Sequence, residues 1–305
     1  MSSVDSKIIT IAEEQLADAQ ESAGVTMRLL HSAEETAEAS LLLDEVWNVG
    51  RAGTTQLEPG LLVALAHSGN YVAAAFDSED DTMIGVTVGF FGEPLGKMMH
   101  SHIAGVRHEH VGRGTGAAMK LHQRLWCLNR GIRQMTWTFD PLIARNANFN
   151  FSRLGVNALE YFEDFYGQMR DGVNEGQASD RLLVSWRLDI AERRPTVGEA
   201  DLERANCLLD VDDTGEPLLK REIPRSTEIA SIRIPVDMES LRGDNPELAS
   251  RWRFALRDGL TGLLDDGWEI SGFLKNGTYL LTHPDDDGPL AEDEISTSEE
   301  EGPRA

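Results

Sequence analysis

The sequence has few of the residues that build disulfide frameworks and metal centres. It contains two cysteines in 305 residues, Cys127 and Cys207, and they are far apart. This spacing argues against a disulfide framework and a cysteine-based zinc site, and it suits a reducing compartment. There is also no run of about 18 uncharged apolar residues, which a membrane span needs, and no basic segment followed by an apolar one at the start. We therefore expect a soluble, cytoplasmic protein that does not associate with membranes.

Positively charged residues are also few. Only five residues are lysine, and 52 acidic residues outnumber 28 basic ones, for a formal net charge of −24. Such a surface repels phosphate backbones, so we expect no nucleic-acid partner. Two explanations remain open: adaptation to a salt-rich cytoplasm, where screening removes the self-repulsion, or an ordinary acidic protein with an acidic tail.

The hydrophobic pattern predicts an α/β chain with mixed helices and strands. Three apolar runs at 71–77, 83–91 and 98–106 are joined by short turns, which is typical of an antiparallel meander. Ser32 and Glu35 are spaced as a capping box at a helix start. The expected strands are 25–30, 71–77, 83–91, 98–106, 135–140 and 182–188, and the expected helices are 4–23, 32–46, 57–66, 114–130 and 144–154.

The same pattern predicts five segments along the chain. They are an N-terminal helix (1–24), a main domain (25–190), a polar connector (191–228), a smaller β-α-β-β region (229–283) and a disordered acidic tail (284–305). About 55 residues bury too little surface to be stable alone. We therefore expect the smaller region to pack on the main domain.

A glycine-rich turn joins the strand at 98–106 to the helix at 114–130. Gly112, Gly114 and Gly116 alternate there. Glycines let a backbone approach a bulky anion, and the free amides of a helix's first turn point at it, so this joint suits a diphosphate. No Gly-Lys-Ser/Thr closes the loop, which excludes a Walker motif. Asp140 follows at the distance of a ribose-binding acid, but at least three strands precede the loop, so a nicotinamide cofactor is the weaker hypothesis.

The stretch from Val106 to Gly116 resembles the acetyl-coenzyme A motif of the GCN5-related N-acetyltransferase (GNAT) superfamily, Gln/Arg-x-x-Gly-x-Gly/Ala. Gly114 and Gly116 match, whereas Val111 stands where Gln or Arg is usual. Residues 146–156 resemble the superfamily's helix leading into a Leu-Gly turn. Residues 137–142, 166–167 and 179–181 resemble a poorly characterised branch of predicted acetyltransferases. The general resemblance covers about residues 25–190.

This resemblance implies a mostly antiparallel mixed sheet flanked by helices, and an acyl-coenzyme A, such as acetyl-coenzyme A, as cosubstrate. The acyl group would pass by direct attack to a small amine or amino-acid-like acceptor. The pantetheine arm would lie along the edge of the strand at 103–106, where Gly105 would permit a bulge. The implied cofactor-binding residues are Ala104, Gly105, Val106, Val111, Gly112, Arg113, Gly114, Thr115, Gly116 and Asn146.

Amine attack needs a base and often an acid, each worth roughly 10² to 10⁴ in rate. The candidate bases are Glu109, His102 and His100, and alternate residues such as the two histidines share one face of a strand. By the resemblance the usual acid is a tyrosine, but Phe151 occupies its position. Either Tyr161 or Tyr166 serves instead, or the thiolate leaves unaided, or the domain binds acyl-coenzyme A without catalysing.

Several alternatives stay open at this point. The His-x-His pairs alone complete no familiar ligand set, so we expect no metal site. Asp140 before Pro141 is either a substrate contact or a turn former. Asp180 and Arg181 are expected to form an ion pair that steadies the last strand. The acceptor, the acyl chain length and the oligomeric state, a homodimer included, are not determined.

Overall fold

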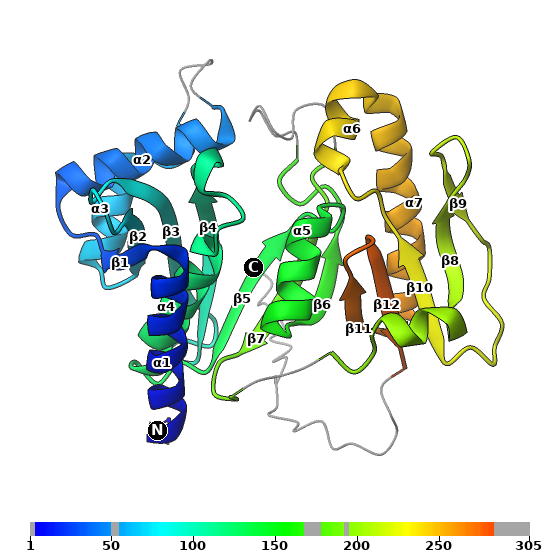
Figure 1. Cartoon of the computed structure of the whole chain (residues 1–305), viewed down its shortest axis with the longest axis horizontal. Helices are drawn as coiled ribbons and strands as arrows, with labels where there is room; N and C mark the ends of the chain where they lie inside the picture. The colour runs from blue at the N-terminus through cyan, green and yellow to red at the C-terminus, as the bar shows by residue number, and fades with distance from the viewer. Residues whose placement is uncertain (1–3, 50–54, 168–177, 192–194, 284–305) are drawn as a thin grey trace, which may run out of the picture.

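Two mixed β-sheets lie side by side in the computed structural model, which describes residues 4–49, 55–167, 178–191 and 195–283 (Figure 1). The first sheet has the strand order β1-β2-β3-β4-β5-β7-β6, and the second has the order β11-β12-β10-β8-β9. The strands of the first sheet are β1 (Val25–Leu29), β2 (Tyr71–Asp77), β3 (Met83–Gly92), β4 (Met98–Val106), β5 (Gln134–Phe139), β6 (Asn157–Phe162) and β7 (Arg181–Arg187). Those of the second are β8 (Asn206–Val211), β9 (Pro217–Leu219), β10 (Ile229–Arg233), β11 (Glu269–Leu274) and β12 (Thr278–Thr282).

Helices cover both faces of the first sheet, which explains why β2 is buried almost throughout. Val72 and Ala74 face the α2 and α3 side, whereas Tyr71 and Ala73 face the α4 side, as the two-residue period of a strand requires. The helices are α1 (Ser6–Ala23), α2 (Ala33–Trp47), α3 (Pro59–His67), α4 (Thr115–Leu128), α5 (Ala144–Ala147), α6 (Met238–Asp244) and α7 (Pro246–Asp265), with short helical segments η1 (His108–His110), η2 (Asn148–Leu154) and η3 (Glu199–Arg204). Of the helices in these ranges, none is long and apolar enough to cross a bilayer.

The predicted mixed α/β fold is confirmed, including the meander β2–β3–β4. The capping box at α2 is also present, because Ser32 Oγ accepts from the Glu35 amide at 3.1 Å. The segment 191–228 was expected to be a polar connector. It instead contains η3, β8 and β9, and it completes the second sheet beside β10. Strand β6 and helix α6 were not expected either. The predicted acidic tail, 284–305, lies outside the described residues.

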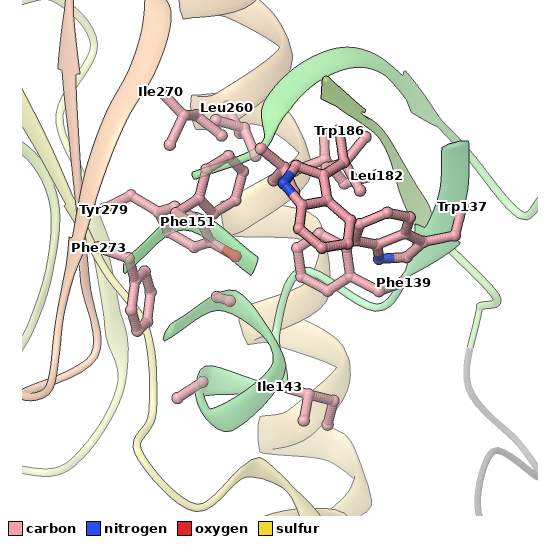
Figure 2. Packing of buried hydrophobic residues seen from close by; sticks show 14 of the residues in the cluster. Trp137, Phe139, Ile143, Phe151, Leu182, Trp186, Leu260, Ile270, Phe273 and Tyr279 are labelled. Carbon is pink, nitrogen blue, oxygen red and sulfur yellow. The ribbon is translucent and has the colours of Figure 1, made fainter. Parts of the chain in front are cut away.

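The second sheet packs against the first through a shared aromatic core (Figure 2). The Phe151 ring lies 6.3 Å from that of Phe139 in β5 and 6.0 Å from that of Tyr279 in β12. Tyr279 also donates to the Pro141 carbonyl at 2.7 Å, and Ser152 Oγ donates to the Phe273 carbonyl at 2.7 Å. The C-terminal region is thus continuous with the core that supports the end of β5.

Candidate functional site

Strands β4 and β5 run parallel and separate after three residue pairs. The last pair joins His100 to Thr136, and β4 continues to Val106 with no other described strand beside it on that side. On its other side β4 stays paired with β3 as far as Val106. Along this edge of β4, the outward N–H and C=O groups beyond His100 are therefore not paired with another described strand.

The bulge in β4 is at His102. The family resemblance had suggested Gly105 instead. Val88 pairs with Ile103 and Gly89 with Ser101, which leaves His102 without a partner in the register. Gly105 has a different role, because a Cβ atom there would lie 3.3 Å from the side chains of α2. Glycine at this position lets α2 pack closely on β4.

The glycine loop at the start of α4 presents a run of unbonded amides. Within the described chain, the amides from Gly112 to Gly116 form no hydrogen bond, whereas the flanking Val111 and Ala117 amides bond to His108 and Gly114 carbonyls. Gly112 and Gly114 have φ of 82° and 100°, conformations that favour glycine. A methyl group added at Gly116 would meet open space. These amides, at the positive end of a 14-residue helix, suit a diphosphate.

His100 and His102 lie on one face of β4, as predicted. Their rings are 5.4 and 5.6 Å from the ring of Phe90. His100 Nδ1 is 3.2 Å from Thr136 Oγ1, so it links the two strands at their last pair. Burial, then His102 and Lys120, lower the pKa of His100 to about 4, and burial also lowers the pKa of the more exposed His102. Both imidazoles are therefore favoured in the neutral form that accepts a proton.

The two candidate tyrosines have different environments. Tyr161 donates to Asp180 Oδ2 at 2.7 Å, and burial and this carboxylate raise its pKa well above the ordinary value. Tyr166 is 43% exposed, and its hydroxyl is 3.3 Å from Thr138 Oγ1, two residues beyond Thr136 on β5. Of these two tyrosines, Tyr166 has its hydroxyl beside Thr138, on the face of β5 that carries Thr136 and Thr138.

The remaining predicted residues are spread around the loop. Glu109 is exposed in η1 and lines a hollow with Asp77 and Asp80 beside the β2–β3 turn. The side chains of Ala104, Val111 and Arg113 are exposed, and Val106 and Asn146 are half-buried. Thr115 is buried, and its hydroxyl has no partner among the described residues. Among the described residues, none of these side chains forms a hydrogen bond or ion pair with His102.

Asp140 and Asp180 are structural anchors between the sheets. Asp140 accepts from the Leu142 amide in a turn and from Arg253 at 2.7 Å through both carboxylate oxygens, and it also pairs with Arg242. This buried group is a turn former and not an open substrate contact. The partner of Asp180 is Arg257, at 2.7 Å, and not Arg181 as predicted. Arg181 donates to the Asp180 carbonyl instead.

One residue of the site, Lys120, was missed by sequence reasoning. It is 8% exposed on α4, with Nζ 2.8 Å from Ser101 Oγ and 3.9 Å from the centre of the Trp137 ring. Ser101 Oγ in turn donates to Gln123 Oε1 at 3.1 Å. The available signal was that Lys120, Gln123 and Cys127 follow one helical face at i, i+3 and i+7. That face turns toward the sheet.

The sequence matches no model of a known protein family and no curated protein. The chain is similar in fold to solved structures over slightly more than half its length. Ard1 from Thermoplasma volcanium is 11% identical, covering 54% of this chain and 97% of its own, with a TM-score of 0.41. An acetyltransferase of the GNAT family from Streptococcus pneumoniae is 12% identical (53% and 99%, TM-score 0.44). The ribosomal-protein-S18-alanine N-acetyltransferase from Escherichia coli is 11% identical (57% and 97%, TM-score 0.42).

Proposed function

We propose that this chain is an acyl-coenzyme A-dependent N-acyltransferase of the GNAT type, with acetyl-coenzyme A as the first donor to test. Its acceptor is a small amine or an amino-acid-like molecule that attacks the thioester directly. The observation that carries the proposal is the run of five unbonded amides, Gly112 to Gly116, next to the unpaired edge of β4.

The two features support binding of different parts of one molecule. The loop amides and the α4 dipole favour a diphosphate. The unpaired edge of β4 offers alternating N–H and C=O groups, as an edge strand does to an added strand, and the pantetheine arm contains two amides that can pair with it. Residues 102–106 span roughly 16 Å at about 3.3 Å per residue. An extended arm can therefore reach from the loop toward the point where β4 and β5 separate.

The chemistry follows from the face that carries His102. A neutral imidazole can take the proton from an attacking amine, a contribution of roughly 10² to 10⁴ in rate. The bulge leaves His102 out of the β3 ladder, so its amide is a candidate donor to the oxyanion that forms on the thioester carbonyl. Tyr166 and Thr138 line the same side and are candidate contacts for the acceptor.

The test uses two glycines that are each helical, exposed and free of neighbours for an added methyl. Gly116 is in the loop end of α4, and Gly262 is in α7. The resembled motif accepts alanine at the Gly116 position, so each glycine is replaced with glutamate, which adds a carboxylate to an exposed part of a helix. Only Gly116→Glu places this negative charge where the diphosphate approaches, so calorimetry should show at least a tenfold loss of coenzyme A affinity, or about 1.4 kcal/mol.

Gly262→Glu should bind coenzyme A like the unmodified protein. Equal affinities for the two variants would contradict the assignment of the loop. This pair is cleaner than a change at Gly114, whose φ of 100° makes any side chain strained.

A non-catalytic acyl-coenzyme A-binding module is the second candidate function. It is favoured by Phe151, which is 3% exposed and packed between Phe139 and Tyr279, because a phenyl ring cannot donate a proton. Release of free thiol from acetyl-coenzyme A with a panel of small amines separates the two. Tight binding without thiol release above the background rate would favour the module.

A further inference from the structure

Lys120 lies at the apex of the gap between β4 and β5. Its two closest partners are Ser101 and Trp137, at 2.8 Å and 3.9 Å. Ser101 is the first residue of β4 beyond the last β4–β5 pair, and Trp137 is the first such residue of β5. One amine thus contacts both strands where they separate, on the face covered by α4.

The surroundings of Lys120 do not compensate a positive charge. No carboxylate lies within ion-pair distance of it in the described chain. The titratable groups near enough to influence its charge are Cys127 on its own helix and His100 on β4. Gln123, which shares Ser101 with it, keeps a buried Nε2 without a partner among the described residues. A buried ammonium without a counter-charge is costly, and this cost makes it a better proton donor.

Proton balance in the proposed reaction calls for such a donor. The amine nitrogen bonds to the thioester carbonyl carbon, the C–S bond breaks, and the sulfur leaves with the electron pair as a thiolate. The proton lost by the amine goes to a base on the His102 face. The thiolate needs a second proton, which Phe151 cannot supply and which Tyr161, bonded to Asp180, is poorly placed to give. The Tyr166 hydroxyl lies beside Thr138, on the opposite face of β5 from Trp137 and Lys120.

We propose that Lys120 is the general acid that protonates the leaving thiolate at the apex between β4 and β5, and that water returns the proton between turnovers. This inference rests on the proposed acyltransferase function. Burial lowers the pKa of Lys120 to about 7, although Cys127 acts in the opposite direction. Both forms of the amine are then populated at neutral pH, and the product of the step is the neutral form that burial favours.

The test is Lys120→Met, which keeps the length of the side chain and removes the amine. Removing a buried ammonium should leave the melting temperature unchanged or raised. Coenzyme A affinity should stay within about twofold, whereas kcat should fall by roughly 10² to 10⁴, the range of general acid catalysis. In the unmodified protein kcat should decrease as pH rises through about 7, and this limb should be absent in Lys120→Met. Lys97→Met, at an exposed lysine in the β3–β4 turn, is the control and should change nothing.

An unchanged kcat in Lys120→Met, or an unmodified protein whose kcat rises through pH 7, would overturn the assignment. Lys120→Arg separates acid from packing roles, since it keeps the charge but does not release a proton near neutrality; full activity in that variant would also overturn it. Should Lys120→Met not fold, the pH profile of the unmodified protein decides. Absence of coenzyme A binding in the unmodified protein contradicts the proposed function, whereas turnover with an unaffected variant contradicts only the role of Lys120.

Discussion

Two buried charged residues have opposite electrostatic surroundings. These residues are Asp140, directly after β5, and Lys120, on α4. Asp140 is 7% exposed and is held by Arg253 and Arg242, while in the described part of the chain Lys120 contacts a hydroxyl and an aromatic ring. Burial alone would raise the pKa of Asp140, but Arg253 and then Arg242 hold it well below its usual range. The Asp140 carboxylate therefore stays charged at all ordinary pH values, whereas the Lys120 amine loses its charge near neutrality. We therefore assign stability to Asp140 and chemistry to Lys120.

Asp140→Asn tests the first half of this contrast. The change leaves the Arg253 guanidinium, 1% exposed, without its counter-charge, and breaking a buried pair costs about 3–5 kcal/mol. Urea unfolding should show this loss at pH 7. Because the folded-state pKa of Asp140 is depressed, its contribution is present above the unfolded pKa and is lost as pH falls below it. The difference in unfolding free energy between Asp140→Asn and the unmodified protein should therefore become smaller at acidic pH.

The matched control is Asp81→Asn on the surface. Asp81 pairs with Arg28 at 2.8 Å, but their side chains are 65% and 46% exposed. Exposed pairs contribute about 0–1 kcal/mol, so this variant should unfold almost like the unmodified protein. Similar losses for both variants would mean that burial does not determine the contribution of Asp140.

At the scale of elements, prediction from sequence works where the signal is local. The capping box fixes the start of α2, and short turns fix the antiparallel order of β2, β3 and β4. The glycine loop is equally local, since its conformation depends on Gly112 and Gly114 themselves. These elements could be placed before any tertiary contact was known.

Elements stabilised by distant partners could not be placed in this way. Strands β8 and β9 have a weak hydrophobic pattern, and α7 packs against them, with Leu208 and Leu219 lining the space beside Gly259. The position of the bulge depends on how β3 pairs with β4, not on which residue of β4 is glycine. A strand of this kind is defined by its neighbours, so its own sequence gives little indication of it.

The candidate site also combines residues that local sequence predicts with residues that only the tertiary structure brings together. The common face of His100 and His102 follows from strand geometry and was predicted. The difference between Tyr161 and Tyr166 depends on Asp180 and Thr138, which the fold brings close to them. Lys120 was overlooked because a single lysine in a helix usually faces water, and only packing against both separating strands gives it a role.

At the scale of the whole molecule, the net charge of −24 should make stability depend on salt. Self-repulsion destabilises the compact state, and the screening length falls from about 10 Å at 0.1 M salt to about 3 Å at 1 M. We expect the melting temperature at pH 7 to rise by several degrees from 0.05 to 1 M potassium chloride. A flat or falling melting temperature would show that attractive surface ion pairs, such as Arg251–Glu216, outweigh the repulsion.

The central claim is that main-chain amides at the start of α4 hold a diphosphate. The most direct measurement is to follow the backbone amide resonances of Gly112, Gly114 and Gly116 by NMR while coenzyme A is added, with Gly262 as the internal reference. The account predicts that the three loop amides shift together and saturably, and that pantetheine, which lacks the diphosphate, shifts them far less. Unmoved loop amides, at coenzyme A concentrations that shift resonances elsewhere in the protein, would contradict it.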